Sequence, residues 1–353
     1  MKILVVGPTA YPWGSDGYGG VERLCALLIR GLTRRGHLLI AAAPEHSYLP
    51  PAVTHIVVPF NSDNTQGEHI ATGRVREAVM PSMVDITLDL SHTHGLRGFS
   101  DWRGFSWLWH DPGMPDSRAM LLENGGTLLL PKTGVVCISE WQKDRLWERL
   151  RVKSAVCDII MVDEATYRYD AAQEPSGRWL CVGIVDWQKG AVETSQMIKG
   201  MPSEALDIIG PPVDEGRARL LTEMGRQTGG RIWYHGEVSE AKKLTMMKAA
   251  KGLLFLPQYP DNWAEAHSMK MVEALCCGTP CLALSKGAIG ELFGKMPGVE
   301  LFSDALAWAS GEMKERIGMG VADVDREYVS ALALSRWSSE AALSRVQALM
   351  NGG

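Results

Sequence analysis

Short apolar segments that alternate with amphipathic ones constrain the fold of this chain most. An apolar strand, GLLFLPQ, is predicted over residues 252–258, and a short turn follows it. A helix is then expected to open at His267 or Ser268 and to stop at Gly278, before a second apolar strand at 280–284. Strands that alternate with helices pair in parallel and are covered by helices on both faces. The chain is therefore predicted to have an α/β fold.

The same alternation runs through both halves of the chain. At 353 residues the chain is too long for one ordinary core, so two domains are expected, with a hinge in the polar stretch 163–176. Strands are predicted at 2–6, 38–43, 55–59, 86–90, 105–109, 134–139, 178–184, 205–210 and 231–236. Helices are predicted at about 21–35, 139–150 (with Ser139 as N-cap), after 190, and at 214–226, 239–250 and 325–350.

Composition excludes several functional classes. The hydrophobic fraction of 46% and charged fraction of 22% are typical of a soluble globular protein, and the net charge of −5 provides no basic field for nucleic acid or an anionic membrane. The seven cysteines lie mostly in apolar runs and none has metal-site spacing with histidine, which indicates small core residues in a reducing compartment. The N-terminal apolar run ends at Gly7 and predicts a buried strand, not a signal peptide, and no run reaches the ~20 apolar residues of a membrane span. We expect a cytoplasmic protein and leave peripheral membrane association open.

Two glutamates mark the segment of greatest chemical interest. Glu265 and Glu273 lie in WAEAHSMKMVEALCCGTPCLA, the first at the start of the predicted helix and the second near its middle. Free backbone N–H groups at a helix start favour an anion, and carboxylates beside them can accept hydrogen bonds from sugar or ribose hydroxyls. Both glutamates are also compatible with the solvated side of an amphipathic helix, so their spacing alone leaves both interpretations open.

Three segments together resemble a known enzyme family. The pattern of Glu265, seven residues and Glu273, followed by ALCCGTPCLAL, is similar to that of the retaining glycosyltransferases of family 4. GGVERLCALLIRGLTRRGH (19–37) resembles the first loop and helix of that family, and VGIVDWQKG (182–190) resembles its phosphate-binding loop. The resemblance covers nearly the whole chain and is more specific in the C-terminal half.

The resemblance implies a fold and an activity. The implied fold is GT-B, in which two Rossmann-like domains face each other across a cleft and a C-terminal helix crosses back to the N-terminal domain. We expect an acceptor-binding domain at 1–168, a nucleotide-sugar-binding domain at 169–325 and the returning helix at 326–353. The implied activity is that of a hexosyl- or related transferase, which moves a sugar from a nucleotide-diphosphate donor to a hydroxyl with retention. The implied donor is UDP- or GDP-linked, and no metal or other cofactor is expected.

The resemblance also assigns roles residue by residue. Lys189 would bind the diphosphate together with the backbone N–H groups of His267, Ser268 and Met269, Glu265 would face the donor sugar, and Glu273 would accept hydrogen bonds from the ribose. Further donor-binding candidates are Gly19, Gly20, Gly183, Gly236, Val238 and Glu291. His110 is the candidate catalytic histidine near the donor sugar. Each of these candidates also has a purely structural interpretation, as a glycine turn, an exposed lysine, a structural histidine or a capping glutamate.

One position departs from the family pattern. Ile184 stands where the family has an arginine directly after the glycine of the phosphate loop. A guanidinium there would form charge-assisted hydrogen bonds to the diphosphate, which isoleucine cannot replace. We therefore expect another cation to substitute, weaker retention of the diphosphate, or unusual handling of the donor. His267, where the family usually has an aromatic residue, is one candidate for a compensating phosphate partner.

The acceptor is less well defined. His94, Trp102 and Arg103 are candidate acceptor-binding residues in an aromatic and basic stretch of the N-terminal half. A glycan, a lipid carrier, a small molecule and a modified nucleic acid all fit. Asp323 and Asp325 form a D-x-D pattern, but they follow no strand, so helix capping explains them better than metal binding.

Two other functions stay open. A degenerate GT-B protein would bind a donor or a partner without turnover, which the loss of the arginine at Ile184 favours. A nucleotide-sugar epimerase of related fold would release free sugar without an acceptor. A nicotinamide-dependent oxidoreductase is disfavoured because no G-x-G-x-x-G motif follows a predicted strand.

Overall fold

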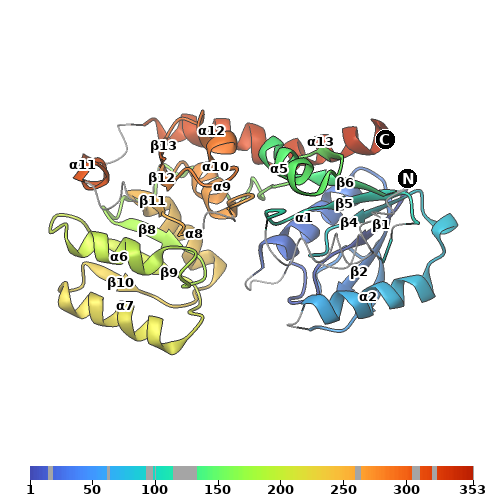
Figure 1. Cartoon of the computed structure of the whole chain (residues 1–353), viewed down its shortest axis with the longest axis horizontal. Helices are drawn as coiled ribbons and strands as arrows, with labels where there is room; N and C mark the ends of the chain where they lie inside the picture. The colour runs from blue at the N-terminus through green and yellow to red at the C-terminus, as the bar shows by residue number, and fades with distance from the viewer. Residues whose placement is uncertain are drawn as a thin grey trace. The chain divides into compact units, whose positions relative to one another are not determined.

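A computed structural model describes residues 1–14, 19–61, 64–92, 98–99, 101–113, 133–258, 264–303, 311–319 and 324–352. The chain folds into two compact units (Figure 1). The first consists of Met1–Asp163 with Ser339–Gly353, and the second is Glu164–Ser338. Two α/β units with parallel sheets were predicted from the alternation of strands and helices, and the structure confirms this prediction.

The first unit is built on a seven-stranded parallel sheet. Its strand order is β3-β2-β1-β4-β5-β6-β7, so the direction of winding reverses between β1 and β4. The strands are β1 (Lys2–Val6), β2 (Leu38–Pro44), β3 (Thr54–Val58), β4 (Ile86–Asp89), β5 (Gly104–Trp107), β6 (Thr133–Cys137) and β7 (Ser154–Val156). The helices are α1 (Gly20–Arg34), α2 (Asn64–Ala78), the short 3₁₀ helix η1 (Pro81–Met83), α5 (Glu140–Leu150) and the C-terminal α13 (Ser339–Gly352).

The second unit repeats the architecture with six strands. Its order is β10-β9-β8-β11-β12-β13, again fully parallel, and the winding reverses between β8 and β11. The strands are β8 (Trp179–Val182), β9 (Leu206–Ile209), β10 (Ile232–Tyr234), β11 (Gly252–Phe255), β12 (Cys281–Leu284) and β13 (Val299–Phe302). The helices are α6 (Ala191–Lys199), α7 (Glu215–Gln227), α8 (Glu240–Ala249), α9 (Met269–Cys276), α10 (Ile289–Phe293), α11 (Gly311–Met319) and α12 (Arg326–Trp337).

Both faces of the second sheet are buried. On one face, Leu254 of β11 and Leu282 of β12 join a core with Ile198 of α6 and Leu221 of α7. Residues that point to the opposite face, such as Phe255, are buried as well. Helices therefore cover the sheet on two sides, and ligands are expected at its strand ends and the loops that follow them.

Helix caps follow the sequence closely. Ser139 accepts a hydrogen bond from Gln142 N, Ser239 from Lys242 N and Asp325 from Tyr328 N, so each side chain satisfies an otherwise free N–H of its helix. The capping role predicted for Asp325 is thus observed, while Asp323 lies outside the described residues. The stretch predicted as one helix at 325–350 is two helices, because Ser338 adopts an extended conformation (φ −61°, ψ 157°).

The last helix returns to the first unit. Leu343 of α13 packs against α1 at Gly31, where an added Cβ would lie 2.1 Å from a Leu343 methyl group. His37 Nε2 lies 2.9 Å from Gln347 Oε1, and Arg35 donates to Ser344 Oγ at 3.0 Å. The chain leaves the second unit only after Ser338, whereas the sequence analysis expected residues from 326 onwards in the returning segment.

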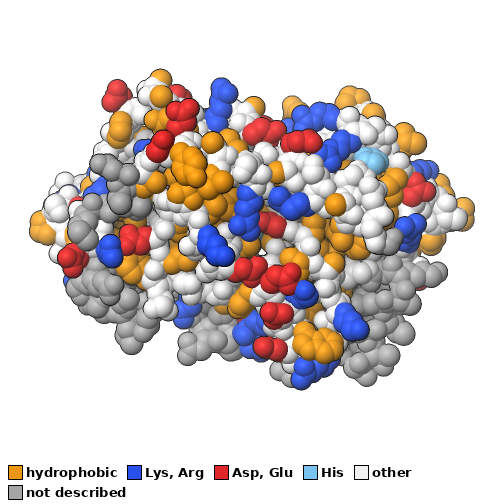
Figure 2. Space-filling model, turned by 90° about the horizontal axis from the view of Figure 1, so that it is seen from above, with side chains coloured by type: hydrophobic (Ala, Val, Ile, Leu, Met, Phe, Trp, Pro, Cys, Tyr) orange, Lys and Arg blue, Asp and Glu red, His pale blue; other side chains and the backbone are white. Residues whose placement is uncertain are grey.

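Charges of both signs are mixed on the face shown in Figure 2, in keeping with the small net charge of −5. No helix in the described ranges is long and apolar enough to cross a membrane. All seven cysteines are buried and free, as their apolar surroundings in the sequence indicate.

Candidate functional site

The carboxyl ends of β8 and β11 define the candidate site in the second unit. The order of strands reverses between these two neighbours, and such switch points are where open α/β sheets bind ligands. Gly183 and Gly210 follow β8 and β9 with φ of +136° and +138°, a region that favours glycine. A Cβ on Gly210 would lie 1.9 Å from the carbonyl oxygen of Gly183, so the two loops approach as closely as backbone allows.

The loop between β8 and α6 carries Lys189. Asp186 Oδ1 accepts a hydrogen bond from Lys189 N at 2.7 Å, which fixes the turn before α6. Gly190 has a φ of +70°, and an added Cβ there would lie 1.9 Å from Leu256 O in the loop after β11. Gln258 N donates to Gln188 O at 2.8 Å between the same two loops. The phosphate-loop candidate is therefore held directly against the segment that leads to α9.

Lys189 and Glu265 form an ion pair at this place. Lys189 Nζ lies 3.0 Å from Glu265 Oε2, with 27% and 14% of the two side chains exposed. The backbone of Glu265 is fixed from the other side, because its carbonyl accepts from Ala288 N at 2.9 Å and packs against Gly287. The two most informative site candidates of the sequence thus contact each other directly.

The start of α9 contains a hydroxyl with no partner. Ser268 is the N-cap residue of α9, but its side chain makes no capping hydrogen bond. Its Oγ is buried and has no hydrogen-bond partner in the described part of the chain, and the residue is only 2% exposed. By helix geometry the N–H groups of Met269 and the next two residues have no acceptor within the helix. The neighbouring His267 packs edge-on against Phe293, with ring centroids 5.8 Å apart.

Lys270 is a further candidate, which the sequence did not indicate clearly. It follows the N-cap by two residues, and its Nζ lies 3.1 Å from the position of a Cβ on Gly183 and 4.1 Å from the centroid of the Phe255 ring. Burial, and then the nearby charge of Lys189, lower the pKa of Lys270 to about 8. The sequence did contain one signal. A lysine in the first turn of a helix is unfavourable because its charge opposes the helix dipole, so a lysine there indicates another stabilising contact.

Glu273 lies deeper and belongs to a buried polar network. It is 3% exposed, and Lys243 Nζ donates to its two oxygens at 3.1 and 3.0 Å. Tyr167 Oη also donates to Glu273 at 3.1 Å and hydrogen-bonds Glu240, which in turn pairs with Lys243 at 2.9 Å. These contacts give Glu273 a structural role in the second unit.

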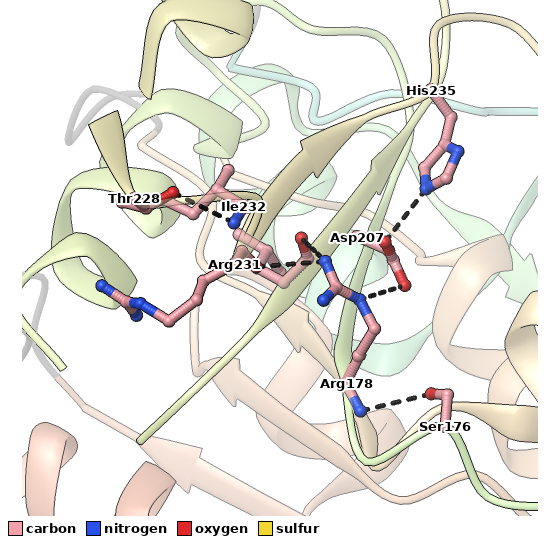
Figure 3. Close-up of polar contacts among 8 residues, drawn as sticks. Ser176, Arg178, Asp207, Thr228, Arg231, Ile232 and His235 are labelled. Atoms are coloured by element: carbon pink, nitrogen blue, oxygen red, sulfur yellow. Dashed lines mark hydrogen bonds and ion pairs between the residues drawn. The ribbon is translucent and has the colours of Figure 1, made fainter. Parts of the chain in front are cut away.

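The segment that starts at Gly236 is positioned by an ionic cluster (Figure 3). Arg178 donates to Asp207 Oδ2 at 2.9 Å and to the carbonyl of Arg231 at 3.1 Å, and His235 Nε2 lies 2.9 Å from Asp207 Oδ1. Gly236 has a φ of +69°, and its carbonyl accepts from Gly210 N at 2.9 Å, so it joins the loop edge that contains Gly183. Val238 follows two residues later, just before α8.

The first unit has its own cluster beside the reversal of strand order. Gly19 caps α1 with a φ of +138°, Gly20 is the first residue of that helix, and a Cβ on Gly19 would lie 2.6 Å from Glu22 Oε2. Burial and the charge of Glu68 raise the pKa of Glu22 to about 7. Burial also raises the pKa of Asp89, which accepts hydrogen bonds from Ser91 and Ser106. A carboxyl with a strongly raised pKa, that of Glu22, thus lies beside the glycine turn where the resemblance expected ligand contact.

His110 follows β5 in the same unit. Its exposed ring stacks on that of His92, with Nε2 of His110 lying 3.2 Å from Nδ1 of His92. Burial and the charge of His110 lower the pKa of His92 to about 3, so His92 stays neutral at physiological pH. Gln142 donates to His110 O at 2.9 Å and fixes the backbone at the end of the strand.

Of the four remaining candidates, three can be described. Trp102 is 1% exposed and packs edge-on to Phe99 in the core of the first unit, so its ring presents no free face for stacking, while Arg103 is exposed. Glu291 is an exposed residue of α10. His94 lies outside the described residues. Among the residues that can be described, no three His, Cys, Asp or Glu side chains are grouped to hold a metal ion.

Comparisons with solved structures identify the fold. No family model and no curated protein matches the sequence. The chain is 20% identical to AviGT4, a glycosyltransferase involved in avilamycin A biosynthesis, with a TM-score of 0.67 over 100% of this chain and 98% of that chain. It is 15% identical to Anabaena HepE in complex with UDP and glucose, with a TM-score of 0.70 over 100% of both chains. It is 13% identical to WaaG, a glycosyltransferase involved in lipopolysaccharide biosynthesis, with a TM-score of 0.68 over 99% of this chain and 100% of that one. The fold is therefore GT-B, as the resemblance implied.

Proposed function

We propose that this protein is a retaining glycosyltransferase that transfers a sugar from a nucleotide-diphosphate donor to a hydroxyl acceptor without a metal ion. The observation that carries the proposal is the Lys189–Glu265 ion pair beside the start of α9, where the first N–H groups have no acceptor within the helix and the buried Ser268 hydroxyl has no partner in the described part of the chain. An anion bound there would be neutralised by fixed donors and a cation. A nucleotide-sugar donor is supported by the similar fold of Anabaena HepE, whose structure was solved in complex with UDP-glucose.

The residues present suit transfer that depends on orientation and charge. A leaving diphosphate develops negative charge as the glycosidic bond breaks, and preorganised N–H groups and Lys189 would stabilise that charge. Glu265, held by Lys189 and by Ala288 N, would accept hydrogen bonds from hydroxyls of the donor sugar. The leaving phosphate would take the acceptor's proton on the same face, which retains the anomeric configuration. His110 is the proposed catalytic histidine, with its backbone fixed by Gln142.

A direct test measures donor binding and turnover. Wild-type protein is titrated with UDP-, GDP- and ADP-sugars by calorimetry, and nucleotide release is followed with and without chelator. Lys189→Met should lose most of the binding, while Lys199→Met, an exposed lysine at the far end of α6, should bind normally. One donor whose binding depends on Lys189 supports the proposal, and retention is then checked by the anomeric configuration of the product. Absence of binding for every sugar nucleotide would refute it.

The products separate the two alternatives. Release of free sugar and nucleotide at a high rate with no acceptor would favour an epimerase of related fold. Tight binding of one donor with no turnover towards any acceptor would favour a degenerate protein, which the isoleucine at 184 keeps open.

A further inference from the structure

Lys270 occupies the space beside the phosphate loop where Ile184 provides no charge. Its Nζ lies 3.1 Å from the point where a Cβ on Gly183 would stand, so the ammonium reaches from α9 across to the loop that follows β8. Lys270, which belongs to α9, therefore places a positive charge beside Ile184, the position at which the family has an arginine. We propose that Lys270 is a second cation that contacts the donor diphosphate together with Lys189, an inference that rests on the proposed function.

The ammonium of Lys270 lacks a partner that would explain its position. Its one described contact is the face of Phe255 at 4.1 Å, and in the described part of the chain no carboxylate forms an ion pair with it. The two carboxylates that raise the pKa of Lys270 have other direct partners: Glu265 pairs with Lys189, and Asp186 accepts from the backbone of Lys189. A half-buried ammonium without a counter-ion is unfavourable unless an anion binds beside it.

Three further features point to an anion at the same place. Lys270 stands in the first turn of α9, where the helix dipole opposes a positive side chain but favours a bound negative group. The Ser268 hydroxyl, buried and unpartnered in the described structure, provides another donor at the N-cap. The positive charge of Lys189 also acts on Lys270, and a doubly charged ligand between the two lysines would relieve the repulsion.

The protonation of Lys270 gives the inference a distinctive signature. Burial and the charge of Lys189 lower its pKa to about 8, against the opposing effects of Cys181, Glu265 and Asp186. Part of the free protein therefore carries a neutral Lys270 near pH 8, and a bound diphosphate would favour the charged form. Because the charged form binds the anion better, affinity should fall as pH rises through about 8. Arginine stays charged throughout this range, so Lys270→Arg should remove the pH dependence.

The test uses the full-length chain and four proteins. Dissociation constants for UDP and GDP, each against its parent nucleoside, are measured between pH 7 and 9.5 for wild type, Lys270→Met, Lys270→Arg and the exposed control Lys199→Met. We expect Lys270→Met to weaken binding of the diphosphate by about ten- to hundredfold, since charge-assisted hydrogen bonds to an ionised group are lost. Binding of the nucleoside should not change. Lys270→Arg should bind within a few-fold of wild type, with a flat pH profile, and it confirms that the position tolerates substitution.

Failure of the inference and failure of the proposed function give different results. If Lys189→Met loses the diphosphate but Lys270→Met binds it within twofold of wild type, Lys270 does not contact the ligand and only this inference falls. An equal loss of diphosphate and nucleoside in Lys270→Met would also overturn it, because the effect would then be structural. If wild type binds neither UDP nor GDP, the inference falls together with the proposed diphosphate site.

Discussion

Glu273 should be needed for the stability of the second unit as well as for any ligand. Its carboxylate accepts two hydrogen bonds from Lys243, and both side chains are largely buried, at 3% and 11% exposure. Removal of one partner of a buried ion pair typically costs about 3–5 kcal/mol, because the other charge stays buried without compensation. Here Glu240 lies 2.9 Å from Lys243 and retains part of the neutralisation. We therefore expect Glu273→Ala to lower the free energy of unfolding by about 3 kcal/mol, at the lower end of that range.

Urea denaturation followed by circular dichroism measures this change directly. A loss of about 3 kcal/mol corresponds to a fall of roughly 6–12 °C in Tm for a domain of this size. Glu240→Ala serves as the matched control: its carboxylate contacts the same lysine but is 26% exposed, so its loss should cost only about 1 kcal/mol. The double variant Lys243→Met with Glu273→Leu should recover most of the stability, since a buried pair replaced by apolar groups is often neutral.

The outcome decides how binding data are interpreted. If Glu273→Ala loses less than about 1 kcal/mol, the burial argument is refuted, and any loss of ligand binding in that variant reports on the ligand alone. If the expected loss is found, the ligand contact must be tested with Glu273→Gln, which keeps the size and one acceptor for Tyr167 while removing the charge.

Three other measurements follow from the geometry. Gly210→Ala should be more destabilising than Gly229→Ala by at least about 2 kcal/mol in urea unfolding, because both have positive φ but only Gly210 would place a Cβ 1.9 Å from a carbonyl oxygen. Glu22→Gln should stabilise the protein at pH 8 but not at pH 4.5, unlike exposed Glu45→Gln; the folded pKa of Glu22 is raised from 4.5 to about 7, so wild-type stability falls as pH rises through that window. Ser268→Ala should leave Tm unchanged or slightly raised, because an unsatisfied buried hydroxyl is removed, while it weakens diphosphate binding; a lower Tm would show that the hydroxyl has a partner.

Helices and strands were predicted correctly where the local sequence pattern agrees with the contacts that the segment makes in the folded protein. Ser139, Ser239 and Asp325 begin helices as expected because a cap is a contact within four residues. The helix α2 (Asn64–Ala78) was missed, since it contains two glycines and buries only a narrow stripe that includes Ala71 and Val75. The break at Ser338 was missed for a similar reason: apolar residues continue on both sides of it, and the local pattern does not show that the chain changes unit there.

The candidate site was predictable where it depends on loops that follow strands, and hidden where it depends on packing between elements. Lys189 and Glu265 were identified from their motifs, and the structure places them 3.0 Å apart although 76 positions separate them in the chain. Lys270 was not identified, because its significance comes from the close approach of α9 to Gly183, a contact that no local pattern encodes. Trp102 shows the opposite case, because this candidate for acceptor binding is buried in the core of the first unit.

The hydrogen bonds and charges around α9 differ between the middle of the helix and its N-terminal end, and this difference indicates that the two parts have different roles. Around Glu273 the hydrogen bonds and charges of the unliganded protein are well matched, which stabilises the fold. At the N-terminal end of the same helix they are not: a serine hydroxyl is buried without a partner, and a lysine has no counter-ion in the described structure. Such unfavourable terms reduce the stability of the free protein, and they are relieved only if an anion binds. A saturating diphosphate should therefore raise the Tm of wild type more than that of a Ser268→Ala, Lys270→Met double variant. Equal shifts would mean that these two groups are not where the ligand binds.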